Sequence, residues 1–171
     1  MPGTAEVVGT ELPMIDRVLE FAARACAIFA GLMMVAIAGM TCYSVFSRTV
    51  LGAAMVGDFE LVQVGMAFAV ASFMPICQLR RGNIIVDFFT QKAAPARRDA
   101  MDRGGALVVA AMMGLLAWRT ALGALESHAS QKVTMMMQVA EWPAFYAMVP
   151  PMALTAVIAL LQAARGTRSA P

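Results

Sequence analysis

Four long apolar segments constrain the fold of this 171-residue chain more than any other feature of its sequence. An α-helix needs about 20 predominantly apolar residues to cross the ~30 Å hydrocarbon core of a bilayer. Segments of this kind, with no Asp, Glu or Lys in their middles, occupy residues 25–46, 60–79, 105–125 and 143–164. Lipid cannot satisfy backbone hydrogen bonds, so each segment must be helical. The sequence therefore predicts an all-α integral membrane protein with four transmembrane helices.

The composition agrees with this class. The chain is 60% hydrophobic and 14% charged, with a mean hydropathy of +0.71, whereas a soluble domain is roughly 45–50% apolar and about 25% charged. Its length suits one domain. We expect a single membrane domain over residues 1–171, with tails at 1–12 and 165–171.

A short amphipathic segment, residues 13–24, precedes the first span. Its apolar residues Ile15, Val18, Leu19 and Ala22 fall on one face of a helix. The span that follows is longer than the roughly 7–15 apolar residues of a signal peptide, so we expect it to be retained. Residues 13–24 are predicted to form a separate interfacial helix, after which the chain turns into the bilayer.

A second interfacial segment is predicted at residues 84–103, between the second and third spans. Its apolar residues flank an aspartate and follow two arginines. We expect its aromatic rings to lie at the acyl boundary and the two arginines that precede it, Arg80 and Arg81, at headgroup phosphates. The candidate lipid-anchoring residues of this region are Arg80, Arg81, Asp87, Phe88 and Phe89.

The distribution of basic residues predicts the orientation. Short cytoplasmic loops retain Lys and Arg, and ten of the 13 basic residues lie on one side of the four predicted spans. Both termini and the connection between the second and third spans are therefore expected to be cytoplasmic. Anionic lipid accounts for this basic side without nucleic-acid binding. The other side carries only Arg48, Arg119 and Lys132.

Charged residues at that other side form a candidate polar cluster. Arg48 closes the first span, and Asp58 and Glu60 open the second. An acid in the first turn of a helix is favoured by the helix dipole, so interfacial anchoring with capping is one interpretation. The other is a cluster that fixes a partner protein, in which Arg48 or a partner's cation is the expected counter-charge of Glu60.

Other residues near the same interface have simpler interpretations. We expect Trp118 and Arg119, near the end of the third span, and Trp142, before the fourth, to anchor the chain at the lipid interface. His128 is expected to be a solvated loop residue. Methionines 135–137 are expected to fill packing gaps. Small residues at four-residue spacing predict helix packing faces; these are Ala27 and Gly31, Gly65 and Ala69, and Ala106, Ala110 and Gly114.

The residues for catalysis or cofactor binding are missing from the sequence. Three cysteines without a CxxC pair and a single histidine give too few ligands for a zinc site, an iron–sulfur cluster or a bis-histidine haem in one chain. The chain contains no P-loop and no G-x-S-x-G motif. Transport, support of another membrane protein and anchoring of a complex remain as functions.

Three motifs and one further stretch add a family resemblance. Residues 45–48 read Val-Phe-Ser-Arg at the end of the first span, and residues 57–62 read Gly-Asp-Phe-Glu-Leu-Val at the start of the second. Residues 78–89 read Gln-Leu-Arg-Arg-Gly-Asn-Ile-Ile-Val-Asp-Phe-Phe, and a Thr134-containing stretch leads through Trp142 into the fourth span. In this order of motifs the chain resembles the small-permease (DctQ-like) subunit of tripartite ATP-independent periplasmic (TRAP) transporters.

The resemblance implies a non-enzymatic subunit of a secondary transporter in the bacterial inner membrane. Its implied partners are a large permease, which holds the substrate and ion sites, and a periplasmic binding protein, which delivers an organic acid, commonly a carboxylate. Na⁺ would be bound by the large permease, and no cofactor is expected in this chain. The candidate residues for contact with these partners are Arg48, Asp58, Glu60 and Gln63.

Two other functions stay open. A self-sufficient small transporter, acting as a homo-oligomer, would be expected to carry an acid at mid-depth, and a membrane anchor of a redox complex would be expected to carry more than one histidine. The four predicted spans have no such acid and the chain has one histidine. The substrate is expected to be selected by residues of other chains.

Overall fold

The computed structural model describes residues 14–52, 57–80 and 95–165. Four helices lie in this part of the chain: α1 (Met14–Leu51), α2 (Asp58–Leu79), α4 (Pro95–Ala129) and α5 (Trp142–Arg165). All four are long and apolar enough to cross a membrane. The predicted all-α membrane fold with four spans is confirmed.

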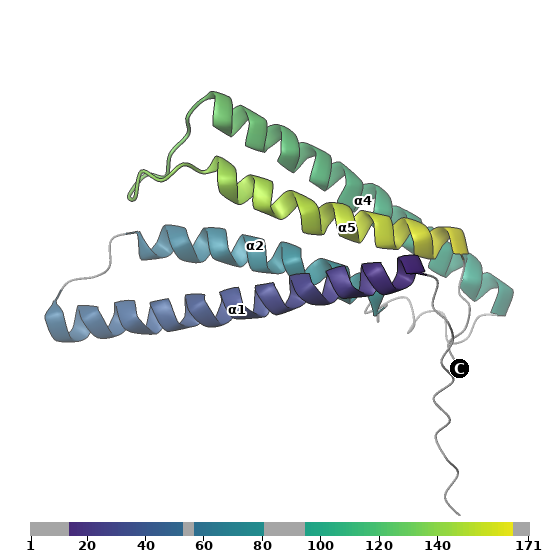
Figure 1. Ribbon diagram of the computed structural model, residues 1–171, viewed down its shortest axis with the longest axis horizontal. Coiled ribbons are helices and arrows are strands. Elements are labelled where there is room, and N and C mark those ends of the chain that lie inside the picture. The colour runs from purple at the N-terminus through teal and green to yellow at the C-terminus, as the bar shows by residue number, and fades with distance from the viewer. Residues whose placement is uncertain (1–13, 53–56, 81–94, 166–171) are drawn as a thin grey trace, which may run out of the picture.

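The four helices are arranged as two hairpins joined along α2 and α5 (Figure 1). Helix α1 packs on α2, and α4 packs on α5. Among the described helices α4 contacts α5 alone, and α1 makes little contact with α5. Helices α2 and α5 therefore occupy the middle, and α1 and α4 form the two outer edges. The start of α1 and the end of α5 lie at the same end of the molecule (Figure 1).

Close approach of α1 and α2 depends on a glycine. A Cβ atom at Gly65 would lie 2.6 Å from Cδ1 of Ile37 on α1. One turn further along α2, Ala69 is fully buried, and the ring of Phe68 meets that of Phe29 edge to face at 5.7 Å. The predicted packing face of α2 is thus correct.

The predicted packing face of α1 is correct only in part: Ala27 is half-buried between Ala23 and Ala30 on one face of the helix, but Gly31 does not belong to that face. A Cβ at Gly31 would meet nothing within 4 Å, and the fully buried small residues of α1 are instead Ala23 and Ala30. Their spacing of seven residues is two helical turns, which keeps both on the side that faces α2.

Helix α4 packs on α5 through small residues at the same spacing. Ala110, Ala117 and Ala124 are buried, and small side chains allow two helix backbones to approach closely in lipid. The predicted face is correct at Ala110 and wrong at Gly114, where an added Cβ would meet nothing within 4 Å.

Polar contacts hold α2 and α5 together near the C-terminal ends of both helices. The side-chain amide of Gln78 donates to Oε1 of Gln162 at 2.8 Å, and the amide of Gln162 donates back to the main-chain oxygen of Gln78 at 2.9 Å. Within α5, Pro151 has no N–H to donate, and Thr155, which is fully buried, donates its hydroxyl to the oxygen of Pro151 at 2.8 Å.

Two helices are longer than the sequence predicts. The expected turn between the interfacial helix 13–24 and the first span is absent, because α1 runs unbroken over 38 residues. No proline interrupts this stretch, and Glu20 pairs with Arg24 one turn later, which supports the helix up to the expected boundary. Gly52, with a φ of +68°, follows the last residue of the helix.

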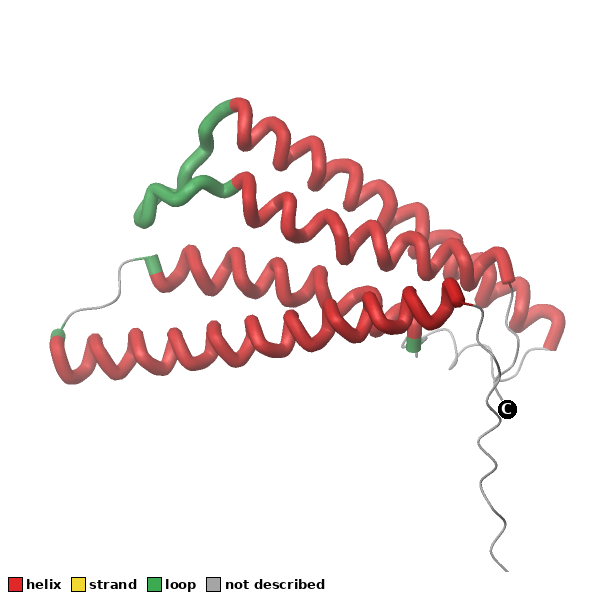
Figure 2. The backbone as a smooth tube through the Cα atoms, in the orientation of Figure 1, coloured by secondary structure: helices red, strands yellow, loops and turns green. Residues whose placement is uncertain are grey.

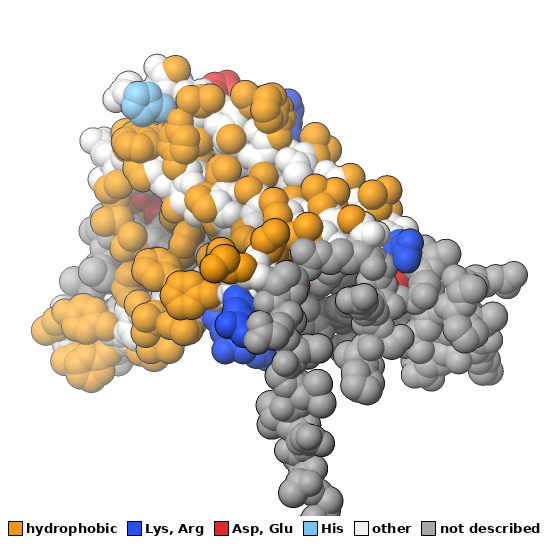
Figure 3. Space-filling model, turned by 45° about the vertical axis from the view of Figure 1, so that its right-hand side comes forward, with side chains coloured by type: hydrophobic (Ala, Val, Ile, Leu, Met, Phe, Trp, Pro, Cys, Tyr) orange, Lys and Arg blue, Asp and Glu red, His pale blue; other side chains and the backbone are white. Residues whose placement is uncertain are grey.

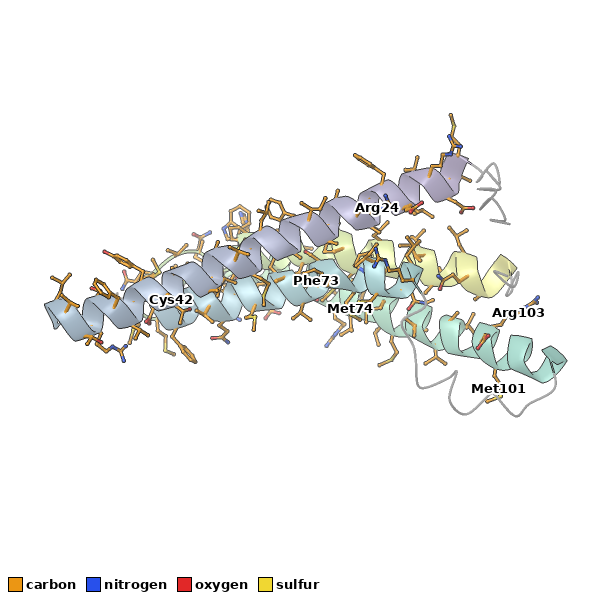
Figure 4. The ribbon with its side chains drawn as sticks, turned by 90° about the horizontal axis from the view of Figure 1, so that it is seen from below. Arg24, Cys42, Phe73, Met74, Met101 and Arg103 are labelled. Atoms are coloured by element: carbon orange, nitrogen blue, oxygen red, sulfur yellow. The ribbon has the colours of Figure 1, made fainter. Side chains whose placement is uncertain are left out.

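Helix α4 likewise begins at Pro95, so the last part of the predicted interfacial segment 84–103 belongs to the same helix as the third span. Proline is favoured in the first turn of a helix because the missing N–H has no partner there. Figure 4 shows this extension past the end of α2, where Met101 and Arg103 lie. The expectations for Arg81, Asp87, Phe88 and Phe89 fall outside the described residues.

Large apolar side chains cover much of the described surface (Figure 3). Along α1 they include Phe21 at 76% exposure, Val35 at 72% and Phe46 at 64%. Such side chains require lipid or another membrane protein around them.

Candidate functional site

The start of α2 lies against the turn that joins α4 to α5 (Figure 2). Gly57 precedes the helix with a φ of +81°, and its main-chain oxygen accepts the N–H of Leu61 at 3.1 Å. A Cβ atom at this position would lie 2.1 Å from Cγ of Met137. Both the backbone conformation and the contact with Met137 therefore require glycine.

Glu60 binds the same turn through its carboxylate. Oε1 accepts the backbone N–H of Met136 at 2.7 Å, and Oε2 accepts that of Met137 at 3.1 Å. Hydrogen bonds from backbone N–H groups to a carboxylate are stronger than those between neutral groups. The side chain of Glu60 thus connects two segments that are 76 residues apart in the sequence.

The α4–α5 turn has its own internal hydrogen bonds. Val133 and Ala140 form an antiparallel bridge, and the N–H of Thr134 donates to the oxygen of Val139 at 2.9 Å. The hydroxyl of Thr134 accepts the N–H of Val139 at 3.2 Å, and Gln138 has a φ of +52°. The turn is a short hairpin whose tip presents the N–H groups of residues 136 and 137 to Glu60.

The sequence led us to expect that the three methionines of this tip fill packing gaps. They do not all do so. Met135 is 96% exposed and Met136 is 69% exposed. Met137 packs against Gly57. Because the residues lie in a tight hairpin rather than on a helix, their side chains diverge, and only one of the three reaches α2.

Asp58 connects α2 to α1 instead of to the turn. Its Oδ2 accepts the hydroxyl of Ser44 at 2.6 Å, and its Oδ1 accepts the N–H of Phe59 at 2.7 Å. Ser44 is only 2% exposed. Arg48, one turn beyond Ser44 on α1, lies within electrostatic reach of Asp58. The two acids at the start of α2 therefore hold two different segments.

The expected counter-charge of Glu60 is Arg48 or a cation of a partner protein, and of these two Arg48 does not pair with it within the described residues. Among the described residues Glu60 is satisfied by backbone N–H groups, and Arg48 forms no ion pair with it. Backbone N–H groups of the α4–α5 turn supply the donors, so Glu60 needs no positively charged side chain within this chain. Gln63, the fourth contact candidate, is exposed on α2.

The residues predicted to lie at the interface have mixed surroundings. Trp118 is 65% exposed and Arg119 is exposed on α4. Trp142, in contrast, contacts His128 at a ring-centroid distance of 5.1 Å and Tyr146 at 6.0 Å. His128 is in the last turn of α4 rather than in a loop. Arg80 is exposed just after α2.

Sequence reasoning missed several residues that position these groups. Nothing in the sequence singled out Ser44 or Gln162, and Gln78 was noted only as the first residue of a motif, because the contacts of all three depend on a partner in another helix. Gly57 and Glu60 are visible in the sequence as parts of a motif. The backbone N–H groups that Glu60 binds cannot be recognised there, because every residue other than proline has one.

The arrangement is suited to holding helices in place. Both acids are occupied by N–H or hydroxyl donors. In the described ranges no group of three or more His, Cys, Asp or Glu residues is placed to hold a metal ion. The polar contacts at the start of α2 fix the positions of α1 and of the α4–α5 turn relative to α2.

Comparison with curated proteins and with solved structures finds no match to this chain. A family model does match: the model of the DctQ component of tripartite ATP-independent periplasmic transporters covers residues 37–169. That range includes α2, α4 and the contacts of Asp58, Glu60 and Gln78. By this match over most of its length, the chain belongs to the DctQ family and is a small membrane component of a TRAP transporter.

Proposed function

We propose that this chain is the stationary small subunit against which the large permease of a TRAP transporter moves its substrate. In this proposal the chain lies in the bacterial inner membrane with both termini in the cytoplasm. A periplasmic binding protein delivers an organic acid, a carboxylate, and an ion gradient drives uptake. Na⁺ is held by the large permease.

One observation carries the proposal: hydrogen bonds connect the two hairpins at both ends of α2. At its start, Glu60 binds the α4–α5 turn. At its end, Gln78 and Gln162 bind each other through two hydrogen bonds. A scaffold has to keep its helices fixed while a partner moves, and these two sets of contacts oppose sliding or opening between α2 and α5.

The distribution of charge supports a scaffold over an autonomous transporter. The predicted spans have no Asp or Glu at mid-depth, where proton- or cation-coupled carriers place their acids. The exposed apolar surface of α1 and α4 offers room for a larger membrane partner.

Reconstitution tests the proposal. Proteoliposomes would contain this chain and the large permease of the same transporter, with the binding protein and labelled organic acids outside. We expect uptake only when all three proteins and an inward Na⁺ gradient are present, without ATP. Undiminished uptake when this chain is omitted would contradict the subunit role, and uptake by this chain alone would establish the self-sufficient transporter.

A further inference from the structure

The outer face of α4 carries a regular stripe of exposed residues. We call it the α4 stripe and define it as Val108, Met112, Leu115, Arg119, Leu122 and Glu126. The four apolar members are between 41% and 62% exposed. Their alternating spacing of four and three residues is that of a helix seam that packs against another helix.

The α4 stripe lies opposite the face that is already used. Ala110, Ala117 and Ala124 are buried on the side toward α5. A step of two residues turns an α-helix by about 200°, and it relates Val108 to Ala110, Leu115 to Ala117 and Leu122 to Ala124. Since α4 contacts no described helix other than α5, no described helix covers its stripe.

Arg119 does not suit a lipid-facing surface. It is exposed, and within the described residues it forms no ion pair. It lies about 9 Å from the end of the 105–125 span, at 1.5 Å per residue. A charge at this depth is costly unless it reaches water, a headgroup or an opposite charge.

The direction of the helix argues against a headgroup. In an α-helix each Cα–Cβ bond tilts toward the N-terminus. The nearer membrane surface is at the C-terminal end of α4, so Arg119 leaves the backbone toward the middle of the bilayer. This holds whichever side of the membrane that end faces. An acidic side chain of a neighbouring protein at the same depth is the better partner.

A second copy of this chain does not supply that acid. Two copies with the same topology would pack around a two-fold axis along the membrane normal, so their α4 helices would be parallel. Each stripe residue would then face its own counterpart, and Arg119 would face Arg119. Like charges opposed at this depth repel.

We propose that the α4 stripe is the surface on which a transmembrane helix of the large permease packs, with a carboxylate of that helix opposite Arg119. The inference rests on the proposed function, because it takes the large permease as the partner. It adds the helix, the face and the charge through which the two subunits meet.

Substitution of Arg119 separates this contact from lipid anchoring. We expect Arg119→Leu to lower recovery of the large permease with the tagged chain about tenfold, as the partner's acid is left unpaired at depth. Arg119→Lys keeps the charge and should retain most of the recovery. Arg103→Leu is the matched control, since Arg103 is exposed on the same helix outside the 105–125 span. Full recovery with Arg119→Leu would overturn the proposal and leave a lipid-anchoring arginine.

Photocrosslinking maps the face. A benzophenone amino acid would replace Leu115 or Leu122 on the stripe, and Leu107 or Leu125 as controls, which lie about a third of a turn from Arg119. All four side chains are exposed. We expect adducts with the large permease from the stripe positions and few from the controls.

Three other crosslinking results would overturn the inference: adducts between two copies of this chain, permease adducts from the control positions alone, or no protein adduct from the stripe. If the wild-type chain still recovers the large permease, such results reject only the α4 stripe. If the large permease is never recovered, the proposed function itself fails.

Discussion

The carboxylate of Glu60 accepts the backbone N–H of Met136 at 2.7 Å across a sequence separation of 76 residues. The donor is part of the main chain, so the identity of residue 136 is free to vary as long as the hairpin keeps its shape. Glu60 is therefore the only one of the two residues whose side chain this contact requires.

Replacing Glu60 should loosen the α4–α5 turn without preventing insertion. In Glu60→Gln the side-chain NH₂ would face one of the two backbone donors, and in Glu60→Ala both donors lose their acceptor. Hydrogen exchange at Met136 and Met137 should accelerate, and uptake should fall by roughly half or more because hydrogen bonds to a charged acceptor are lost. Glu141→Gln, at the other end of the turn, is the control. Unchanged exchange and uptake would reduce Glu60 to an acid that favours the helix dipole.

Gly57→Ala should be more destabilising than Gly52→Ala. Both positions have positive φ, and alanine there costs about 1–3 kcal/mol. Only Gly57 also faces a side chain, since a Cβ at Gly52 would meet nothing within 4 Å. Thermal unfolding in detergent should rank the two variants, and Met137→Ala should rescue part of the loss in Gly57→Ala. Equal midpoints for the two single variants would exclude the contact with Met137.

Removing the hydroxyl of Ser44 should weaken the α1–α2 hairpin. The hydroxyl is buried and donates to Asp58 at 2.6 Å, so Ser44→Ala leaves that acceptor without one donor. We expect a thermal midpoint lower by a few degrees, and the same substitution in an Asp58→Asn background should have a smaller effect. Thr49→Ala is the control, because Thr49 bonds only within α1. A Ser44→Ala effect that is the same in both backgrounds would show that the two residues are not coupled.

The two glutamines at the ends of α2 and α5 should be energetically coupled. A double-mutant cycle of Gln78→Leu and Gln162→Leu should give an interaction energy of about 0.6–2 kcal/mol, the range for polar contacts between membrane helices. Reversible unfolding in mixed micelles would provide the four free energies. Additive effects of the two substitutions would mean that the paired amides do not hold the helices together.

The orientation is predicted from the basic residues and can be measured with a reporter that is active only in the periplasm. A fusion after Arg98 should be silent, and one after Lys132 should be active. The reverse pattern would place both termini on the periplasmic side and would invert every assignment of sides made above.

The sequence predicted the number of helices because each span is recorded in an uninterrupted apolar run. It also placed α2 and α5 closely, since Gly57 and Trp142 mark their starts. It failed at the start of α1 and α4, where amphipathic residues continue the helix beyond the apolar run and no breaker stops it. The partner of Glu60 could not be predicted, because a backbone N–H leaves no trace in residue type.

The dependence of Glu60 on a distant turn also has a consequence for biosynthesis. Helices α1 and α2 leave the ribosome first, and at that stage the contact between Ser44 and Asp58 can already form within their hairpin. Glu60 has no backbone donors from the turn until residues 136 and 137 have been made, and Gln78 waits longer still for Gln162. The first hairpin is therefore made before its contacts with the second can form. The second hairpin then supplies the partners of Glu60 and Gln78, at the two ends of α2.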